Sequence, residues 1–183
     1  VDTFSQKNGV TPFMTLMAAY AVILAKYSNQ NDICVGTPIA NRNNQDIENI
    51  VGFFVNTLVI RNNIDLNQSF GQLIESVKNN ALNAFAHQDV PFEQIVDTVN
   101  PERSTSHTPL FQVMMSYQDM SEISLESDDT EVGINENTTS KFDLTLTLAS
   151  YKNGLAGSAE FSTELFDAST IKRIVFHIKE LLE

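Results

Sequence analysis

The amino-acid sequence predicts an α/β (α+β) two-layer sandwich, in which helices cover one mixed sheet of about five strands. Two observations lead to this fold class. Apolar residues recur with the helical period in two long segments, and other segments are β-rich or alternate between apolar and polar residues. With 183 residues, the chain fits one domain or one large half of a two-part domain.

Cap residues and apolar spacing predict four helices. The first is apolar nearly all round, so neighbouring elements must cover it on most sides. The second opens with a capping box formed by Ser69 and Gln72. The expected helices run from Pro12, behind the cap Thr11, to about Tyr27; from Ser69 to near His87; from Pro91 to about Val99; and from the cap Asp167 to the end of the chain.

Turn signals separate the β-rich segments. Gly36 and Pro38 are expected to break the first of them, and Asn153 with Gly154 forms a hairpin turn between the last two. The segment 119–139 is acidic and poorly periodic, and holds only one weak strand candidate. The expected strands are Ile33–Ala40, the buried strand Phe53–Arg61, Leu110–Tyr117, Phe142–Tyr151 and roughly Ala156–Phe161, with the weak candidate at Val132–Ile134.

Charge and apolar content argue against two classes of partner. Eleven Lys and Arg residues against twenty-three Asp and Glu give a net charge of −12, which disfavours nucleic acid and anionic membranes. The most apolar run, 12–25, is too short to span a bilayer. The single Cys34 cannot form an internal disulfide, which suits a reducing cytosol and a cytoplasmic protein. Because the chain opens at Val1 without an initiator methionine, we expect a piece of a longer protein.

The stretch HQDVPFE, His87–Glu93, places an imidazole and two carboxylates close together. It is either half of an acid–base site or the join between two helices. As a join, Asp89 caps the next helix by accepting from the Phe92 N–H, and Pro91 occupies its first turn. Glu93 then opposes the positive end of the helix dipole, and His87 lies at the negative end of the preceding helix, which favours a protonated imidazole over a general base. We therefore favour the helix junction.

No other pattern in the sequence points to catalysis or to a metal. His107 lies in a loop rich in Ser and Thr, and His177 lies near the end of the last helix. No His has another His, a Cys or a Glu at metal-ligand spacing, so no metal site is expected. The GxSxG, GxGxxG and P-loop patterns do not occur in the sequence.

Asn56 and Thr57 are polar residues inside an otherwise apolar strand. An unpaired amide buried there would cost on the order of 1–3 kcal/mol, so Asn56 needs a partner. Either its side chain satisfies a neighbouring main-chain group, or it faces a channel or a subunit boundary and contacts a substrate there. Spacing alone favours the structural alternative.

Three segments of the sequence are VGFFVNTLVIR (Val51–Arg61), HQDVPFE (His87–Glu93) and RSTSHTPLFQVMMSYQ (Arg103–Gln118). They resemble, in order and spacing, the last three signature motifs of the condensation domains of nonribosomal peptide synthetases. Residues 11–42, 141–148 and 154–183 are also similar to that family, so the resemblance covers nearly the whole chain.

The resemblance implies the second half of a chloramphenicol-acetyltransferase-like domain, with residues 1–183 as the C-terminal subdomain. In that family two such halves form a V-shaped pseudo-dimer around a tunnel. Carrier proteins deliver donor and acceptor on 4′-phosphopantetheine arms from opposite ends, and the acceptor amine attacks the donor thioester. The implied partners are the N-terminal half, donor and acceptor peptidyl carrier proteins and a neighbouring adenylation domain, with no cofactor bound directly.

The chain departs from the family in one respect. The active-site motif HHxxxDG belongs to the first half and is absent here, so no catalytic residue is assigned. We expect the chain alone to be inactive, and to self-associate through the surface that would meet the first half. The resemblance favours a tunnel-side role for Asn56 and Thr57. It implies structural roles for the other motif residues, namely Gly52, Phe54, Arg61, His87, Asp89, Pro91, Phe92, Glu93, Pro109, Leu110 and Phe111.

Three alternatives remain at this point. An epimerisation domain shares the fold, although its counterpart of GFFVNTLVI usually has a different pattern. A heterocyclisation domain replaces the histidine motif with paired aspartates, which would lie outside this chain. A non-enzymatic module could bind a carrier protein without chemistry. The sequence upstream of Val1 would separate these functions.

Overall fold

The computed structural model describes residues 1–42, 44–102, 107–122 and 139–183, and the weak strand candidate Val132–Ile134 lies outside them. Within the described ranges, no helix is both long and apolar enough to cross a membrane. The helices are α1 (Asp2–Lys7), α2 (Pro12–Ser28), α3 (Gln45–Glu48), α4 (Phe70–Ala86), α5 (Phe92–Val99) and α6 (Ala168–Leu182). The strands are β1 (Asp32–Ile39), β2 (Asn56–Asn63), β3 (Val113–Met120), β4 (Leu144–Tyr151) and β5 (Gly154–Phe161).

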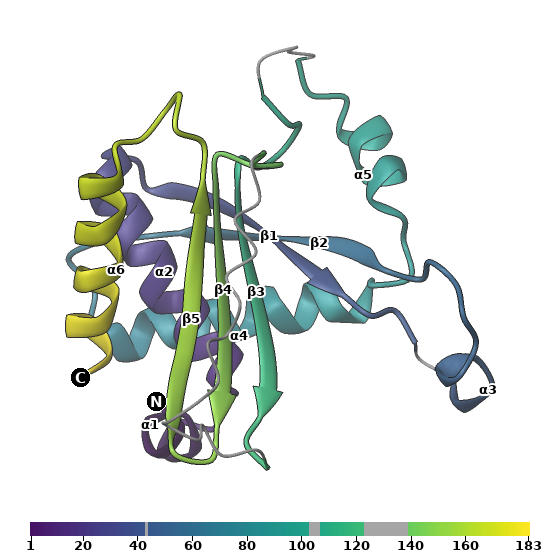
Figure 1. Cartoon of the computed structure of the whole chain (residues 1–183), viewed down its shortest axis with the longest axis horizontal. Coiled ribbons are helices and arrows are strands. Elements are labelled where there is room, and N and C mark those ends of the chain that lie inside the picture. The colour runs from purple at the N-terminus through teal and green to yellow at the C-terminus, as the bar shows by residue number, and fades with distance from the viewer. Residues whose placement is uncertain (43, 103–106, 123–138) are drawn as a thin grey trace.

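The strands form one mixed sheet of five strands in the order β2-β1-β3-β4-β5. The two outer pairs are antiparallel, and the β1–β3 and β3–β4 pairs are parallel. Helices α4, α2 and α6 lie side by side on one face and pack against β2, β1 and β5 respectively (Figure 1). This arrangement confirms the predicted two-layer sandwich, and it leaves α5 beside the end of β2, away from the other helices.

The core lies between the sheet and helix α2. Val35 and Ile60 of the neighbouring strands β1 and β2 are fully buried, as is Met115 of β3. Residues 17–21 of α2 are completely enclosed, which confirms that this nearly all-apolar helix is covered on most sides. The capping box is also confirmed, because Ser69 Oγ accepts from the Gln72 N–H at 3.3 Å while Gln72 Oε1 accepts from the Ser69 N–H at 3.0 Å.

Strand β1 differs from the prediction because it continues through Gly36 and Pro38. The ring of Phe111 lies directly over Gly36, where a side chain would collide with it, so the glycine allows a close approach and does not end the strand. β1 pairs with β3 only at Val35 and Gly36, and Pro38 lies beyond this pairing, where proline is tolerated.

The starts of three strands were predicted too early, and β4 differs least because it begins at Leu144 and not at Phe142. β2 begins at Asn56 and not at Phe53, because Phe53 belongs to an irregular segment and its side chain is 92% exposed. β3 begins at Val113 and not at Leu110, because Leu110 has a φ of 68°, which is incompatible with an extended strand. The short helices α1 and α3 were not predicted. Asp167 occupies the N-cap of α6, as predicted, but its side chain makes no capping bond.

Candidate functional site

A cavity of about 560 Å³ lies at the end of the sheet nearest α5. Its walls come from five segments: residues 53–57 at the start of β2, 89–93 at the α4–α5 junction, 108–114 at the start of β3, 141–142 before β4, and 38–41 at the end of β1. The first three belong to the three motif segments of the sequence. The fold thus brings these three motifs together around one cavity.

Three aromatic rings form the apolar side of this cavity. The ring centroids of Phe92 and Phe111 lie 5.6 Å apart at an interplanar angle of 64°, and those of Phe111 and Phe142 lie 5.4 Å apart. Both separations fall in the range that favours aromatic pairs. Phe111 is central to this contact and is only 2% exposed, so it links the α5 side of the cavity to the β4 side.

A tight turn before β3 places Phe111 in this position. Leu110 adopts a left-handed conformation, and the Phe111 N–H donates to the Pro109 carbonyl at 2.9 Å. Thr108 Oγ1 donates to the Phe111 carbonyl, and Gln112 Nε2 donates to the Thr108 carbonyl at 3.0 Å. These bonds hold the chain in a conformation that costs a non-glycine residue roughly 1–2 kcal/mol. The motif residues Pro109 and Phe111 thus line one wall of the cavity, and the turn at Leu110 positions them.

Asn56, the first residue of β2, is hydrogen-bonded to the α4–α5 junction. Its Nδ2 donates to the carbonyls of Gln88 and Val90, both at 2.8 Å. Its Oδ1 accepts from the main-chain N–H of Phe92 at 3.2 Å and of Thr57 at 2.9 Å. The carboxamide is therefore paired with main-chain groups within the chain while Asn56 and Thr57 both border the cavity.

The stretch HQDVPFE is a helix junction in the structure. Helix α5 begins at Phe92 with Pro91 as its N-cap, so the prediction that Asp89 is the cap residue is wrong: Asp89 lies two positions before the N-cap, and the Phe92 N–H donates to Asn56. His87 is the C-cap of α4, and its Nδ1 lies 2.9 Å from the Asn83 carbonyl of the same helix. His87 is not among the described residues that line the cavity.

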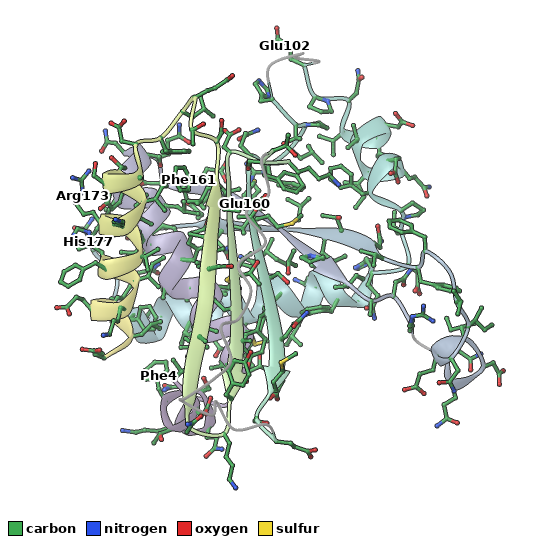
Figure 2. The ribbon with its side chains drawn as sticks, viewed as in Figure 1. Phe4, Glu102, Glu160, Phe161, Arg173 and His177 are labelled. Carbon is green, nitrogen blue, oxygen red and sulfur yellow. The ribbon has the colours of Figure 1, made fainter. Side chains whose placement is uncertain are left out.

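The charged residues of the cavity are two carboxylates and one amine. Asp89 and Glu93 line it from the α5 side, and Lys141 lines it from the β4 side. Lys141 is the only cation among the described lining residues, and its Nζ lies 5.5 Å from the centroid of the Phe142 ring. No histidine occurs among those residues. His177 lies on the outer side of α6, at the β5 edge (Figure 2), where its Nδ1 is 3.0 Å from Tyr27 Oη.

Sequence reasoning missed the role of Arg42. Its Nη1 donates to the carbonyls of Glu48 at 3.2 Å and Ile50 at 2.9 Å, and also to Ile47. Its guanidinium carbon lies 4.4 Å from the centroid of the Phe54 ring. One arginine thus organises the segment that leads into β2. No local pattern in the sequence indicates this, because the partners are main-chain groups.

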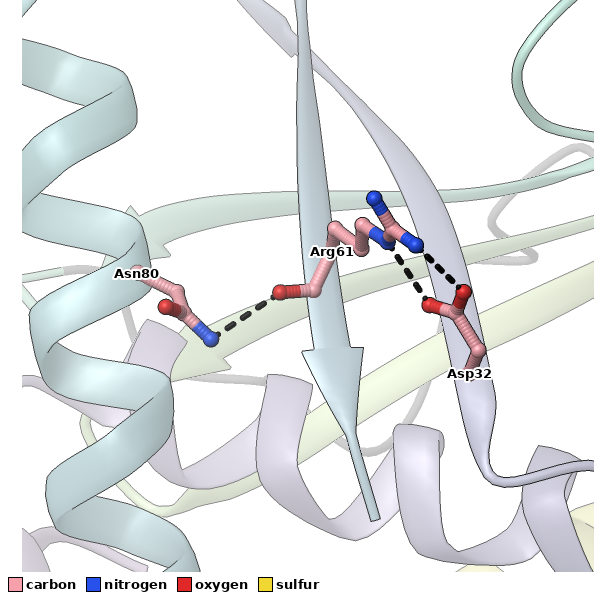
Figure 3. A network of polar contacts seen from close by, with 3 residues as sticks. All are labelled: Asp32, Arg61 and Asn80. Carbon is pink, nitrogen blue, oxygen red and sulfur yellow. Dashed lines mark hydrogen bonds and ion pairs between the residues drawn. The ribbon is translucent and has the colours of Figure 1, made fainter.

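The motif residue Arg61 lies outside the cavity. Its Nε and Nη2 donate to Asp32 Oδ1 and Oδ2 at 2.9 and 2.7 Å, while the Arg61 carbonyl accepts from Asn80 Nδ2 at 2.9 Å (Figure 3). The hydrogen bonds from Arg61 lower the pKa of Asp32 below its usual value. This pair joins β1 to β2, which agrees with the structural role implied for Arg61.

No cation site is evident in the described part of the chain, since no group of three His, Cys, Asp or Glu side chains there could hold a metal ion. Cys34 is a free thiol on β1, and partial burial raises its pKa.

Comparison with known proteins decides the family. The family model described as the condensation domain matches residues 1–183. The chain belongs to the condensation-domain family. It is 46% identical to one of the linear gramicidin synthase proteins of Brevibacillus parabrevis, over all of this chain and 4% of that protein. It is 40% identical to surfactin synthase subunit 1 of Bacillus subtilis (strain 168), over all of this chain and 5% of that protein. The condensation-domain chain therefore spans only a small part of these relatives.

Solved structures confirm the condensation-domain fold. A four-domain nonribosomal peptide synthetase, holo-AB3403, matches with a TM-score of 0.86 and 25% identity, over 98% of this chain and 15% of that one. The condensation domain from the monacolin K polyketide synthase MokA matches with a TM-score of 0.80 and 21% identity, over 97% of this chain and 42% of that one. The resemblance drawn from the sequence motifs is thereby confirmed, together with the chloramphenicol-acetyltransferase-like fold.

Proposed function

We propose that this chain is the C-terminal, acceptor-side half of a condensation domain that forms amide bonds between carrier-bound aminoacyl or peptidyl thioesters. The order of the three motifs supports this assignment. The match to 42% of the MokA condensation-domain chain supports it too, because that fraction is what one half of a two-part domain would cover. In this proposal the N-terminal half, carrying HHxxxDG, supplies the remaining wall of a tunnel and the histidine that handles the amine proton.

The cavity is the observation that carries this proposal. Residues from three separate motifs line it, and their aromatic side chains offer an apolar surface beside the polar residue Thr57. A phosphopantetheine arm is long and thin, with methylene and geminal methyl groups between its hydroxyl and two amides, and a lining that mixes aromatic and polar residues suits it. Lys141 is a cation near which the arm's phosphate could lie.

The proposed reaction needs little acid–base chemistry from this half. The acceptor nitrogen attacks the carbonyl carbon of the donor thioester, a C–N bond forms, the C–S bond breaks, and the proton lost by the amine ends on the thiol of the donor carrier. Since no histidine occurs among the described cavity residues, this half contributes by positioning. Correct positioning of two reactants supplies up to roughly 7–11 kcal/mol of a barrier.

Blocking the cavity tests the proposal. Val55 lines the cavity and is half exposed, so Val55→Trp should fill it with little cost in folding. In a complete two-half domain, we expect this variant to form condensation product from carrier-bound thioesters at least about tenfold more slowly. Val175→Trp is the matched control, because Val175 is similarly exposed but lies on α6 beside a different hollow. Equal rates for both variants would contradict the proposal.

Two further measurements address the fragment and the docking-module alternative. The purified chain alone should form no amide product above a control without protein, and addition of the separate N-terminal half should restore product. If the two-half domain bound acceptor carrier protein but never formed an amide, the chain would instead belong to a docking module.

A further inference from the structure

We infer that Asn56 is a positioning residue that ties the α4–α5 junction to β2 and thereby sets one wall of the cavity, without itself contacting the reacting groups. The hydrogen bonds of Asn56 to the junction do not depend on any function. Their effect on a reaction rests on the proposed function. Asn56 links two motifs, FVNT and HQDVPFE, whose bonded residues lie more than thirty positions apart in the sequence.

The hydrogen-bonding capacity of the Asn56 carboxamide is filled by the chain. A primary amide has two N–H donors and an oxygen with two lone pairs. Both donors of Asn56 reach carbonyls of the junction, at 2.8 Å each, and the oxygen accepts from Phe92 and Thr57. No part of the amide is left to bind a substrate. A substrate could gain an Asn56 contact only by breaking one of these bonds.

Helix α5 has few other anchors. None of its residues is buried, and its N-cap, Pro91, has no side-chain acceptor for the first N–H groups. The oxygen of Asn56 therefore acts as the missing cap by accepting from the Phe92 N–H. The ring pair of Phe92 and Phe111 adds a contact at this end. A short helix with so little burial opens readily, so loss of Asn56 should loosen it selectively.

The consequence for the cavity follows from its lining. Asp89, Pro91, Phe92 and Glu93 all line it, and all belong to the segment that Asn56 holds. When this wall loosens, the cavity should hold an acceptor arm less well both before and during reaction. A loss of that kind raises KM and leaves kcat nearly unchanged. A direct contact with the reacting amine would instead lower kcat.

Hydrogen exchange of the chain tests the tie without any assay of activity. In Asn56→Ala, main-chain amides of residues 92–96 should exchange at least about tenfold faster than in the wild type. Asn56→Asp loses both donor bonds and sets a carboxylate oxygen against the carbonyls of Gln88 and Val90, so it should also raise exchange at 92–96. The matched control is Asn80→Ala, because Asn80 Nδ2 donates to the Arg61 carbonyl at 2.9 Å and so also joins a helix to β2, away from the cavity. Unchanged exchange at 92–96 in Asn56→Ala, or an equal increase in the control, would overturn the inference.

Steady-state kinetics of the two-half domain test the effect on the reaction. Asn56→Ala should raise the KM for the acceptor carrier about tenfold and change kcat by less than about threefold, while Asn80→Ala changes neither. A large fall in kcat at unchanged KM would assign Asn56 to the reacting groups and overturn the positioning role. If the wild-type domain formed no amide, the proposed function would fail, and the exchange experiment would still decide whether Asn56 holds α5.

Discussion

The ring of Phe111 lies against the α-carbon of Gly36, where a Cβ would be 2.5 Å from Phe111 Cζ and nearer still to Cε2. Both residues are buried, and they join strand β1 to the turn before β3. Only a residue without a side chain lets these segments approach so closely. The same ring also contacts Phe92 and Phe142, so the identity of residue 36 affects the shape of the cavity.

We expect Gly36→Ala to lower the free energy of unfolding by about 1–3 kcal/mol, because the added methyl group must displace the Phe111 ring from a packed site. Urea unfolding of the purified chain measures this. Gly71→Ala is the control: Gly71 lies in the first turn of α4, the nearest atom to an added Cβ would be Ser69 Oγ at 3.9 Å, and alanine should stabilise the helix by about 0.5–1 kcal/mol. A Gly36→Ala chain as stable as the wild type would show that the ring moves freely.

Much of the fold could be predicted from local signals. The capping box of Ser69 and Gln72 marked the start of α4, and the Asn153-Gly154 signal marked the hairpin of β4 and β5, although the turn lies at residues 152–153 and Gly154 already belongs to β5. Both signals act over a few residues, so the sequence displays them directly. The motif resemblance singled out three distant segments, and the structure brings them together around one cavity, which residue spacing alone could not predict.

The errors concern contacts between distant segments. The first residues of the run 53–61 are apolar, yet Phe53 faces outward. The prediction of a buried strand there failed because composition cannot distinguish a buried strand from an exposed apolar segment. Asp89 is a good cap residue by type, but Asn56 supplies an acceptor for the Phe92 N–H from another element. The sequence required that Asn56 have a partner and left open which one.

Asp32 and Arg61 predict a small pH dependence of stability. Arg61 lowers the pKa of Asp32 in the folded chain, so the pair stabilises the fold above the unfolded pKa of about 4 and loses this effect as the pH falls through the lower folded pKa. Both side chains are largely exposed, so Asp32→Asn should lower Tm at pH 7 by less than about 4 °C. The difference in Tm between wild type and variant should shrink toward about pH 3 and in high salt. A difference that grows on acidification would contradict this sign.

The position of His87 at a helix end predicts that its substitution has little effect on the condensation rate. Its ring nitrogen lies by the Asn83 carbonyl of its own helix, and a glutamine amide could make the same contact. In the two-half domain, His87→Gln should change the condensation rate by less than about threefold, whereas loss of a true general base costs about 10²–10⁴-fold. A loss of a hundredfold or more with unchanged Tm would assign acid–base work to this motif.

Self-association of the isolated chain is expected from an exposed apolar segment. Val51 is fully exposed and Phe53 is 92% exposed, and both lie in the segment that Arg42 holds through main-chain carbonyls. An apolar surface held in one shape loses little conformational entropy on binding, so it is well suited to pair with another apolar surface. Light scattering should therefore show an average mass that rises with protein concentration.

The double variant Val51→Ser and Phe53→Ser should abolish this rise, because it removes apolar surface without touching the core. Phe176→Ser is the matched control, since Phe176 is 55% exposed but lies on α6, on another part of the surface. If the control abolished association and the double variant did not, the outer face of α6 would be the contact surface. A monomer at every concentration in the wild type would mean that the exposed segment, although apolar, does not suffice to bind a second copy.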